Sequence, residues 1–295
     1  MDNINILLSV NTEYAKYAEE LIFSLLKYSS RKVTVFLMYT KLGMDLDRLR
    51  KIKCFIKANN AEFVPIIFDT KDLDGVPVHD RTGKYYGLES YGRLFSPFLL
   101  PDSVKKILYL DVDMICTGDI AELYDINFDG NLWCACPDLG IKQQDLERLS
   151  LSNDFKYVNS GVLLINAEEI RKKYNQEMIK DLIIENSSLL VYPDQDFLNK
   201  VFGDNIKRIN VKYNTTPKDN GFKDLKEKPL IIHFAGKRRP WSDDVSGIEL
   251  GFMQEYYNVL KQQPDKKDFL IRLKKEHEKK GYWNRPYDCF EYNSK

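Results

Sequence analysis

The order of apolar and polar residues along the first part of the chain predicts strands that alternate with helices. Short apolar or β-branched runs, typical of strands, lie at 4–10, 33–39 and 61–68. Between them, apolar side chains recur at helical spacing over 14–28 and again over 45–58. Strands that alternate with helices form a parallel sheet that is covered on both faces. We therefore expect an α/β fold.

The rest of the chain is expected to extend this sheet. Residues 105–111 predict a central strand, and a short helix is expected to begin near Asp196. The other expected elements are strands at 132–138, 157–166 and 229–236 and a helix at about 167–186. The polar, glycine-bearing stretch from 76 to 92 is too long for a simple connection, so it is either functional or mobile. No internal repeat or low-complexity linker divides the sequence, which favours a single domain over residues 1–260.

The C-terminal tail, residues 261–295, has a different charge pattern. Residues 261–285 hold nine Lys/Arg against four Asp/Glu, and Phe269, Leu270 and Leu273 are able to share one helix face. Two interpretations of this basic helical tail stay open. It packs on the body of the protein with its charges in solvent, or it makes weak electrostatic contact with an anionic membrane surface.

Composition limits the class of protein. The 295 residues are 43% hydrophobic and 30% charged, as in ordinary globular proteins, and a formal net charge of zero predicts no general affinity for nucleic acid. The five cysteines have no zinc-site spacing, which indicates reduced thiols. The N-terminus lacks the basic and apolar regions of a signal peptide, and no apolar run approaches the about 20 residues that span a bilayer. A cytoplasmic location is therefore expected.

Two carboxylates, Asp111 and Asp113, come at the end of the strand predicted at 105–111. If the strand continues through Val112, both side chains point to the same face, about 7 Å apart along the chain. Two like charges at this distance repel each other unless a cation lies between them or one of them is protonated. A pair of this kind is equally well explained by a turn cap and a solvated acid, so other residues must decide.

Two polar clusters interrupt apolar patterns further along the chain. Residues 194–196, Asp-Gln-Asp, follow a proline and precede an apolar helical pattern, where capping alone also favours acids. Residues 159–161, Asn-Ser-Gly, break an apolar strand with polar and small side chains. In an α/β sheet such a break is typical of a place where a ligand approaches the backbone.

A histidine and three cations lie together near residue 235. His233 ends the last predicted strand, and residues 236–239, Gly-Lys-Arg-Arg, follow it directly. This pattern suits a metal-bound diphosphate, with the imidazole on the metal and the cations on the oxygens, although a lone strand histidine is more often structural. Together with Asp111 and Asp113, His233 offers a mixed oxygen and nitrogen ligand set, which suits Mn²⁺ better than Ca²⁺. Mg²⁺ is the alternative ion.

Six segments in this order resemble the family 8 glycosyltransferases, the retaining enzymes that include bacterial lipopolysaccharide galactosyl- and glucosyltransferases and the glycogenins. Between about residue 4 and residue 241 these segments are SVNTEY, SYGRL, YLDVDMI, VNSGVLLIN, PDQDFLN and HFAGKRRPW. The resemblance implies a GT-A fold, a Rossmann-like nucleotide-diphospho-sugar half joined to a variable acceptor half, with a mixed central sheet and helices on both faces. It also implies transfer of a hexose from UDP-galactose or UDP-glucose to a glycan or lipid-linked acceptor in cell-surface polysaccharide synthesis. Such an enzyme is expected in the cytoplasm or at the inner face of the membrane.

The resemblance assigns roles to the residues that match the family's motifs. The expected metal ligands are Asp111, Asp113 and His233. The residues expected around uridine are Ser9, Asn11 and Tyr14. Those expected around the donor sugar are Arg93, Asn159 and the catalytic pair Asp194 and Gln195. The diphosphate is expected at Gly236 and Arg239, and the donor-binding set is completed by Val112, Ser160, Gly161 and Lys237.

The implied mechanism retains the configuration of the sugar. Gln195 would lie opposite the leaving group, but an amide is a poor nucleophile, so we expect attack from the face that the diphosphate leaves, with a diphosphate oxygen taking the acceptor's proton. Asp194 would hold donor hydroxyls. Residues 76–92, with His79 and Arg81, are expected to form a lid over the donor.

Two departures from the family pattern affect donor recognition. Asn11 stands where an acid is common, and Glu13 stands where an amide is common, so contacts to uracil are expected to be rearranged. Arg239 replaces a lysine before Pro-Trp, which keeps the charge and changes its shape.

Two alternative functions stay open. An apolar strand followed by residues 111–115, Asp-Val-Asp-Met-Ile, also resembles the start of haloacid-dehalogenase-type phosphatases, in which the first aspartate is a nucleophile. That motif normally opens its domain, whereas three predicted strands precede it here, and it leaves His233 without a role. The second alternative is a non-catalytic module that binds nucleotide sugars.

Overall fold

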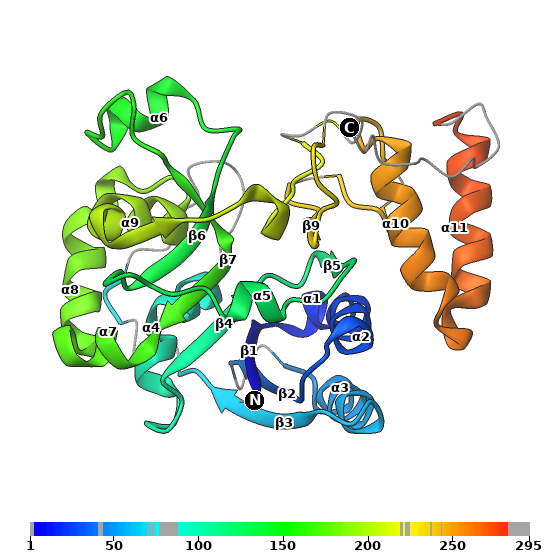
Figure 1. Ribbon diagram of the computed structural model, residues 1–295, viewed down its shortest axis with the longest axis horizontal. Coiled ribbons are helices and arrows are strands. Elements are labelled where there is room, and N and C mark those ends of the chain that lie inside the picture. The colour runs from blue at the N-terminus through cyan, green and yellow to red at the C-terminus, as the bar shows by residue number, and fades with distance from the viewer. Residues whose placement is uncertain are drawn as a thin grey trace.

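The computed structural model describes residues 3–40, 44–69, 71, 74–76, 88–218, 221, 225–236, 238–242 and 244–282. The strands of the main sheet are β1 (Ile4–Ser9), β2 (Val33–Tyr39), β3 (Glu62–Ile67), β4 (Lys106–Leu110), β6 (Trp133–Pro137), β7 (Val158–Asn166) and β8 (Ile206–Arg208). A second, two-stranded sheet consists of β5 (Met114–Cys116) and β9 (Ile231–His233). The main sheet has the order β3-β2-β1-β4-β7-β6-β8 (Figure 1).

Helices surround these sheets. The α-helices are α1 (Thr12–Ala15), α2 (Ala18–Tyr28), α3 (Leu46–Ala58), α4 (Gly92–Leu99), α5 (Ala121–Tyr124), α6 (Gln143–Arg148), α7 (Ala167–Lys173), α8 (Gln176–Asn186), α9 (Pro193–Phe202), α10 (Leu250–Lys261) and α11 (Lys267–Lys279). The short 3₁₀ turns are η2 (Leu88–Tyr91), η3 (Ser187–Leu189), η4 (Gly203–Asn205), η5 (Val211–Tyr213) and η7 (Pro264–Lys266).

The sheet is mixed, as expected. Strands β1 to β4 are parallel to one another, so the βαβ pattern predicted for the first part of the chain is confirmed. Pro65 lies in β3, which is an edge strand of the main sheet. Because proline has no backbone N–H to donate, it is tolerated in a strand with a neighbour on only one side. β7 runs antiparallel to both β4 and β6. The start of β7 therefore lies beside the end of β4.

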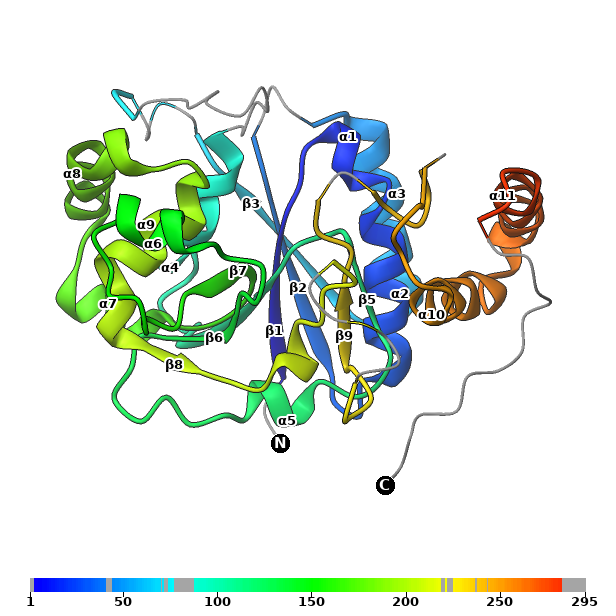
Figure 2. The ribbon, with the colours of Figure 1, turned by 90° about the horizontal axis from the view of Figure 1, so that it is seen from above.

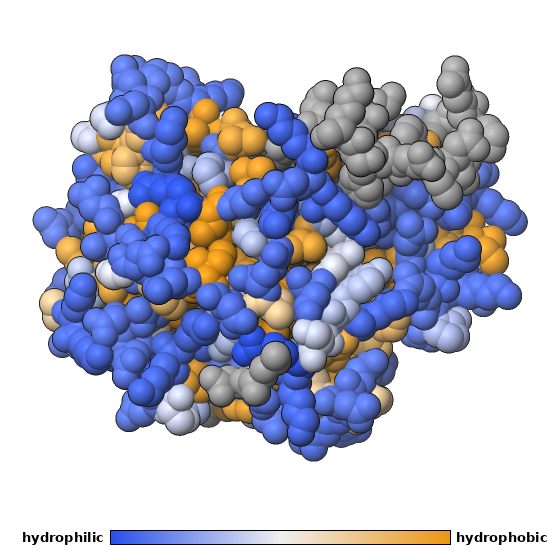
Figure 3. Space-filling model, in the orientation of Figure 1, coloured by the Kyte–Doolittle hydropathy of each residue, from blue (hydrophilic) through white to orange (hydrophobic). Residues whose placement is uncertain are grey.

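Two apolar layers cover the sheet. Alternate residues of β1, such as Ile6 and Leu7, point to opposite faces and belong to different clusters of buried side chains. One cluster packs against α2 and α3, and the other packs against α4, α8 and α9 (Figure 2). On the face shown in Figure 3, side chains over α7 and α8 are mainly hydrophilic, and apolar ones gather nearer the middle.

Two predicted helices are each divided into two. The expected helix at 14–28 breaks at Tyr17, whose ring stacks on Trp241 with a centroid separation of 4.1 Å. The expected helix at 167–186 breaks before Asn175, whose side chain accepts a hydrogen bond from the backbone N–H of Met178 and so caps α8. In both places a side chain with a specific partner stabilises the break.

The C-terminal helices pack beside the smaller sheet. Leu270 and Leu273 of α11 are buried in one cluster with residues of α10, β5 and β9, so their apolar face is covered by protein. The first interpretation of the tail, packing on the body, therefore describes residues 261–282, and residues 283–295 lie outside the described part. Within the described residues, none of the helices has the length and apolar character needed to cross a membrane.

Candidate active site

The chain leaves the main sheet at the aspartate pair. β4 ends at Leu110, so the strand does not continue through Val112, and strand alternation does not set the directions of the two carboxylates. The backbone N–H of Asp111 still donates to the carbonyl of Gly161 on β7, at 2.9 Å, but Asp113 already bonds to the smaller sheet, where its carbonyl accepts from Phe234. This change of sheet, rather than strand alternation, brings the two carboxylates toward one point.

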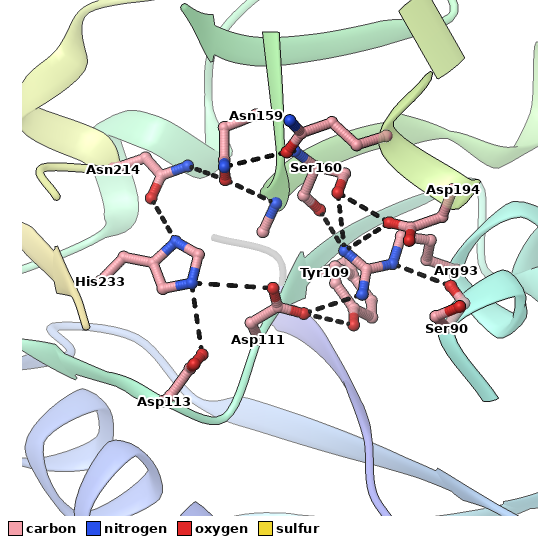
Figure 4. A network of polar contacts seen from close by, with 12 residues as sticks. Ser90, Arg93, Tyr109, Asp111, Asp113, Asn159, Ser160, Asp194, Asn214 and His233 are labelled. Carbon is pink, nitrogen blue, oxygen red and sulfur yellow. Dashed lines mark hydrogen bonds and ion pairs between the residues drawn. The ribbon is translucent and has the colours of Figure 1, made fainter. Parts of the chain in front are cut away.

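His233 completes a cluster with the two carboxylates. Its Nε2 lies 3.3 Å from Oδ1 of Asp113 and 3.8 Å from Oδ2 of Asp111 (Figure 4). One ligand atom from each of the three side chains lies within 4.8 Å of the others. We call Asp111, Asp113 and His233 the Asp-Asp-His cluster. Two carboxylates and an imidazole fit a divalent metal ion such as Mn²⁺.

Burial and the charges of neighbouring groups shift the pKa of each of the three side chains in this cluster. Burial, aided by the charge of Asp113, raises the pKa of Asp111. Burial also acts to raise the pKa of Asp113, but His233 and Arg239 outweigh it and hold that pKa below its usual range. Burial acts to lower the pKa of His233, and the two carboxylates outweigh it and raise that pKa. The cluster therefore favours a positive charge between its carboxylates.

The residue at the break in β7 lies against this cluster. A Cβ atom on Gly161 would lie 2.8 Å from Nδ1 of His233 and 2.9 Å from Oδ2 of Asp111, closer than real Cβ contacts. Only glycine leaves these two side chains where they are.

Arg93 connects the cluster to the residues expected around the donor sugar. Arg93 belongs to α4. Its Nη2 lies 3.0 Å from Oδ1 of Asp111, and its Nη1 lies 3.2 Å from Oδ2 of Asp194. Nη1 also donates to the Ser160 carbonyl at 2.7 Å. The guanidinium lies 4.4 Å from the centre of the Tyr109 ring. Burial acts to lower the pKa of Arg93, but the carboxylates outweigh it, so the residue is a fixed cation.

Gln195 is held by hydrogen bonds at both ends of its amide. Its Oε1 accepts from Nδ2 of Asn159 at 3.0 Å and from the backbone N–H of Ser160 at 3.2 Å. Its Nε2 donates to Oδ2 of Asp138 at 3.0 Å. The amide is therefore fixed in one orientation.

The acids beside Gln195 have different surroundings. Asp194 is buried and accepts a hydrogen bond from Ser160 Oγ at 2.7 Å, next to Arg93. Asp196 is fully buried and accepts from the Tyr157 hydroxyl, from Arg148 and from two backbone amides that precede α9. Asp194 thus faces the site, while Asp196 holds the start of the helix.

Arg239 contacts the second aspartate of the cluster, Asp113. Its Nη2 lies 3.0 Å from Oδ2 of Asp113, and its Nη1 donates to the Tyr14 hydroxyl at 3.3 Å. Its Nε is buried and has no hydrogen-bond partner among the described residues. A buried, unpartnered donor on a cation is a place where an anionic ligand fits.

The structure describes all but one of the remaining expected donor-binding residues. Ser9 ends β1, and the side chain of Asn11 caps α1 by accepting from the backbone N–H of Tyr14 at 2.9 Å. Val112 is buried between the two aspartates, and Gly236 has a φ of 109°, which favours glycine. Lys237 and residues 77–87, most of the expected lid, lie outside the described residues.

Three residues at the site were not predicted from the sequence. Oδ1 of Asn214 lies 3.0 Å from Nδ1 of His233, and its Nδ2 donates to Oδ1 of Asn159 at 2.8 Å. Asp138 holds Gln195, and the Tyr109 hydroxyl donates to Oδ1 of Asp111 at 2.7 Å. Only Asp138, which directly follows an apolar strand, had a sequence signal that could have identified it.

The α/β sheet, with an Asp-x-Asp pair at the carboxyl end of a central strand and a histidine facing it, has the GT-A fold. The chain belongs to glycosyl transferase family 8, whose model matches residues 5–245. The resemblance drawn from the sequence is therefore confirmed, and the protein is a glycosyltransferase. The phosphatase alternative is wrong.

Relatives and solved structures agree with this assignment. A lipopolysaccharide 1,3-galactosyltransferase of Salmonella typhimurium is 27% identical over 255 residues, which cover 81% of this chain and 73% of that protein. A lipopolysaccharide 1,2-glucosyltransferase of Escherichia coli is 27% identical over 207 residues, covering 65% and 60%. The galactosyltransferase LgtC, solved with donor and acceptor sugar analogs, gives a TM-score of 0.75 at 19% identity over 87% of this chain and 95% of that one. That structure shows the fold alone, which is the GT-A fold expected.

Proposed function

We propose that the protein transfers galactose or glucose from a UDP-sugar to a glycan or lipid-linked acceptor, with Mn²⁺ and with retention at the anomeric carbon. The observation that carries this proposal is the convergence of the Asp-Asp-His cluster with Arg239 and its unpartnered Nε. The names of the lipopolysaccharide transferases it resembles support a role in cell-surface polysaccharide synthesis.

The metal would be held by Asp111, Asp113 and His233. Their mixed oxygen and nitrogen ligands suit Mn²⁺ better than Ca²⁺, and Mg²⁺ is the alternative. When bound, the ion supplies Lewis-acid neutralisation of the diphosphate leaving group. Arg239 adds fixed positive charge through its Nε, and Lys237 is proposed to assist it. The nucleotide would extend from there toward Tyr14, Asn11 and Ser9.

The donor sugar would lie between the cluster and α9. Arg93 is anchored to Asp111 and Asp194, so it joins the metal site to the carboxylate that we propose binds donor hydroxyls. Asn159, which is also expected at the donor sugar, is fixed by hydrogen bonds with Asn214 and Gln195. The sugar would therefore meet side chains that are already oriented before it binds.

The surroundings of Gln195 favour attack from the front face. Its oxygen already accepts two hydrogen bonds, from Asn159 and from the amide of Ser160, which reduces its ability to act as a nucleophile. We propose that Gln195 stabilises the positive charge that develops on the sugar, while a diphosphate oxygen takes the acceptor's proton. The bond to the acceptor then forms on the face that the diphosphate leaves.

We also propose a weak contact between the tail and an anionic membrane surface. Exposed residues of α11 include Arg272, Lys275 and Lys279, and the exposed side chains of Asp268, Ile271 and Glu276 line the same surface. The apolar face of the helix is covered, so this contact would depend on charge and not on insertion. It would place the enzyme near lipid-linked acceptors.

The metal assignment is tested with Asp113→Asn. The variant loses one of two carboxylates, so we expect Mn²⁺-dependent UDP binding to disappear in calorimetry. Metal-stimulated binding at the normal affinity would contradict the assignment. If the unaltered protein binds UDP with Mn²⁺ but neither transfers nor hydrolyses UDP-galactose or UDP-glucose, the proposed donor is wrong.

Retention is tested by the configuration of the product. The NMR spectrum of product formed from an α-linked UDP-sugar should show an α linkage. A β linkage would show inversion and would contradict the front-face mechanism.

A further inference from the structure

The short loop that carries Arg239 is fixed from behind. This Arg239 loop, residues 238–242, follows β9 and ends beside α10 (Figure 1). Trp241 stacks on Tyr17 at 4.1 Å, with 19° between the ring planes, and lies 6.0 Å from the ring of Tyr256. The ring contacts fix one end of the loop.

A histidine of the C-terminal helix reaches the same loop. His277 of α11 is fully buried, and its Nε2 lies 3.2 Å from the carbonyl oxygen of Ser242. Its Nδ1 lies 2.7 Å from the hydroxyl of Tyr257. Because a carbonyl only accepts, Nε2 must carry a proton, and in the neutral form of the ring Nδ1 accepts from the hydroxyl.

Ser242 connects His277 to Arg239 through further hydrogen bonds. The backbone N–H of Arg239 donates to Ser242 Oγ at 3.2 Å, and Ser242 Oγ lies 2.7 Å from the carbonyl of Arg239. The Arg239 guanidinium in turn lies 3.0 Å from Asp113. A continuous series of polar contacts therefore runs from the core of the C-terminal helix to the Asp-Asp-His cluster.

We infer that His277 is a positioning residue, which holds the Arg239 loop so that the guanidinium faces the diphosphate of the donor. This inference rests on the proposed function. Packing alone does not require an imidazole at this place, because Leu270 and Leu273 already give α11 its apolar contacts. A buried polar ring is retained at lower cost where both of its nitrogens have partners, and here one of those partners belongs to the loop.

The test compares affinity for UDP with affinity for uridine, which has no phosphates. In His277→Leu the loop loses its anchor, so we expect UDP affinity with Mn²⁺ to fall about tenfold in calorimetry, the equivalent of one charge-assisted hydrogen bond. Uridine affinity, from an NMR titration, should not change. His277→Gln keeps an N–H that reaches the Ser242 carbonyl, so it should recover most of the UDP affinity.

Leu273→Ala is the matched control, because it weakens the packing of the same helix and leaves the contact between His277 and the Ser242 carbonyl in place. It should lower thermal stability and leave the ratio of UDP to uridine affinity unchanged. If His277→Leu fails to fold, Ser242→Ala, which removes the side-chain contacts to Arg239, should show the same selective loss.

An unchanged affinity ratio in the variant that is measured, or an equal fall in Leu273→Ala, would overturn the inference about His277 alone. Failure of the unaltered protein to bind UDP in the presence of Mn²⁺ would instead overturn the proposed function.

Discussion

The backbone at Gly161 passes so close to the Asp-Asp-His cluster that a side chain would collide with it. The neighbouring residues make the same edge polar, since Ser160 contacts Asp194 and Arg93, and Asn159 contacts Gln195. The break in the apolar pattern of β7 therefore has a physical cause. A strand that passes this close to the Asp-Asp-His cluster needs a glycine and short polar side chains there.

Gly161→Ala should damage the metal site more than the fold. Its Cβ would displace His233 or Asp111, so we expect UDP affinity with Mn²⁺ to fall about tenfold or more. Overpacking should also lower the free energy of unfolding by about 1–3 kcal/mol. Calorimetry and urea unfolding measure the two effects. Gly203→Ala, whose Cβ would lie 2.7 Å from the Phe155 ring, is a control with a similar clash elsewhere, and equal loss of UDP binding in that variant would contradict this prediction.

Asn214→Ala should weaken Mn²⁺ binding at the proposed site without removing a proposed ligand. The Asn214 carbonyl oxygen lies 3.0 Å from His233 Nδ1, so it fixes the ring with Nε2 toward the aspartates. Loss of a partner of this kind costs about 10- to 100-fold in metal affinity, which a Mn²⁺ titration followed by electron paramagnetic resonance would measure. An unchanged Mn²⁺ affinity would show that the ring is oriented by packing alone.

Sequence patterns identified the residues with distinctive chemistry and missed those whose role depends on neighbours. Asp111, Asp113 and His233 could be selected because carboxylates and an imidazole at strand ends suggest a metal. Asn214 and Tyr109 are ordinary polar residues, and nothing local distinguishes them. Their roles arise only when β4, β7 and β9 meet.

At the scale of elements, most of the long periodic segments were predicted, although α4 and α10 were missed, and two of the shortest strands were not predicted. β5 and β8 have three residues each, too few for a pattern of alternation to be recognised. The two helix breaks were missed because apolar spacing continues across them, while Tyr17 and Asn175 depend on partners or capping. The second of these breaks did have a signal in the sequence, because asparagine is a typical N-cap residue and Asn175 directly precedes α8.

The start of α9 depends on one buried acid. Asp196 accepts hydrogen bonds from Tyr157, from Arg148 and from two backbone amides, so Asp196→Ala leaves several donors unpaired. We expect the free energy of unfolding to fall by about 3–5 kcal/mol in urea titrations. Asp145→Ala is the control, since Asp145 pairs with the same arginine on a more exposed side, and its loss should cost about 1 kcal/mol or less. Equal losses would contradict the structural role of Asp196.

At the scale of the whole molecule, the site depends on the direction of one strand. Because β7 is antiparallel, its first residues lie at the carboxyl end of β4, where Leu110 pairs with Val162. A parallel β7 would place residues 159–161 at the far edge of the sheet, away from Asp111. Strand direction is a long-range property, so the residues alone did not predict it, and the mixed sheet followed only from the family resemblance.

The tail joins this body through both apolar and charged contacts. Leu270 and Leu273 are buried, and Lys266 lies 3.0 Å from Glu19 and 3.2 Å from Glu20 of α2. Burial of a leucine side chain is worth about 1.5–3 kcal/mol, so deletion of residues 263–295 should destabilise the whole protein. Deletion is therefore a poor test of membrane contact, because lost binding and lost folding would coincide.

Charge reversal separates the two effects. We expect the full chain to sediment weakly with anionic vesicles at low salt, at about 1 kcal/mol for each basic residue near the surface and less where Asp268 and Glu276 offset it. The triple substitution Arg272→Glu, Lys275→Glu and Lys279→Glu changes only exposed positions, so it should abolish sedimentation and leave the thermal midpoint and UDP-sugar hydrolysis unchanged. Neutral vesicles are the control, because a contact that depends on charge should be absent there. If the unaltered protein does not sediment with anionic vesicles, or if the charge-reversed variant still does, the basic face of α11 has no role at a membrane. The helix then contributes only to the fold and to the position of the Arg239 loop.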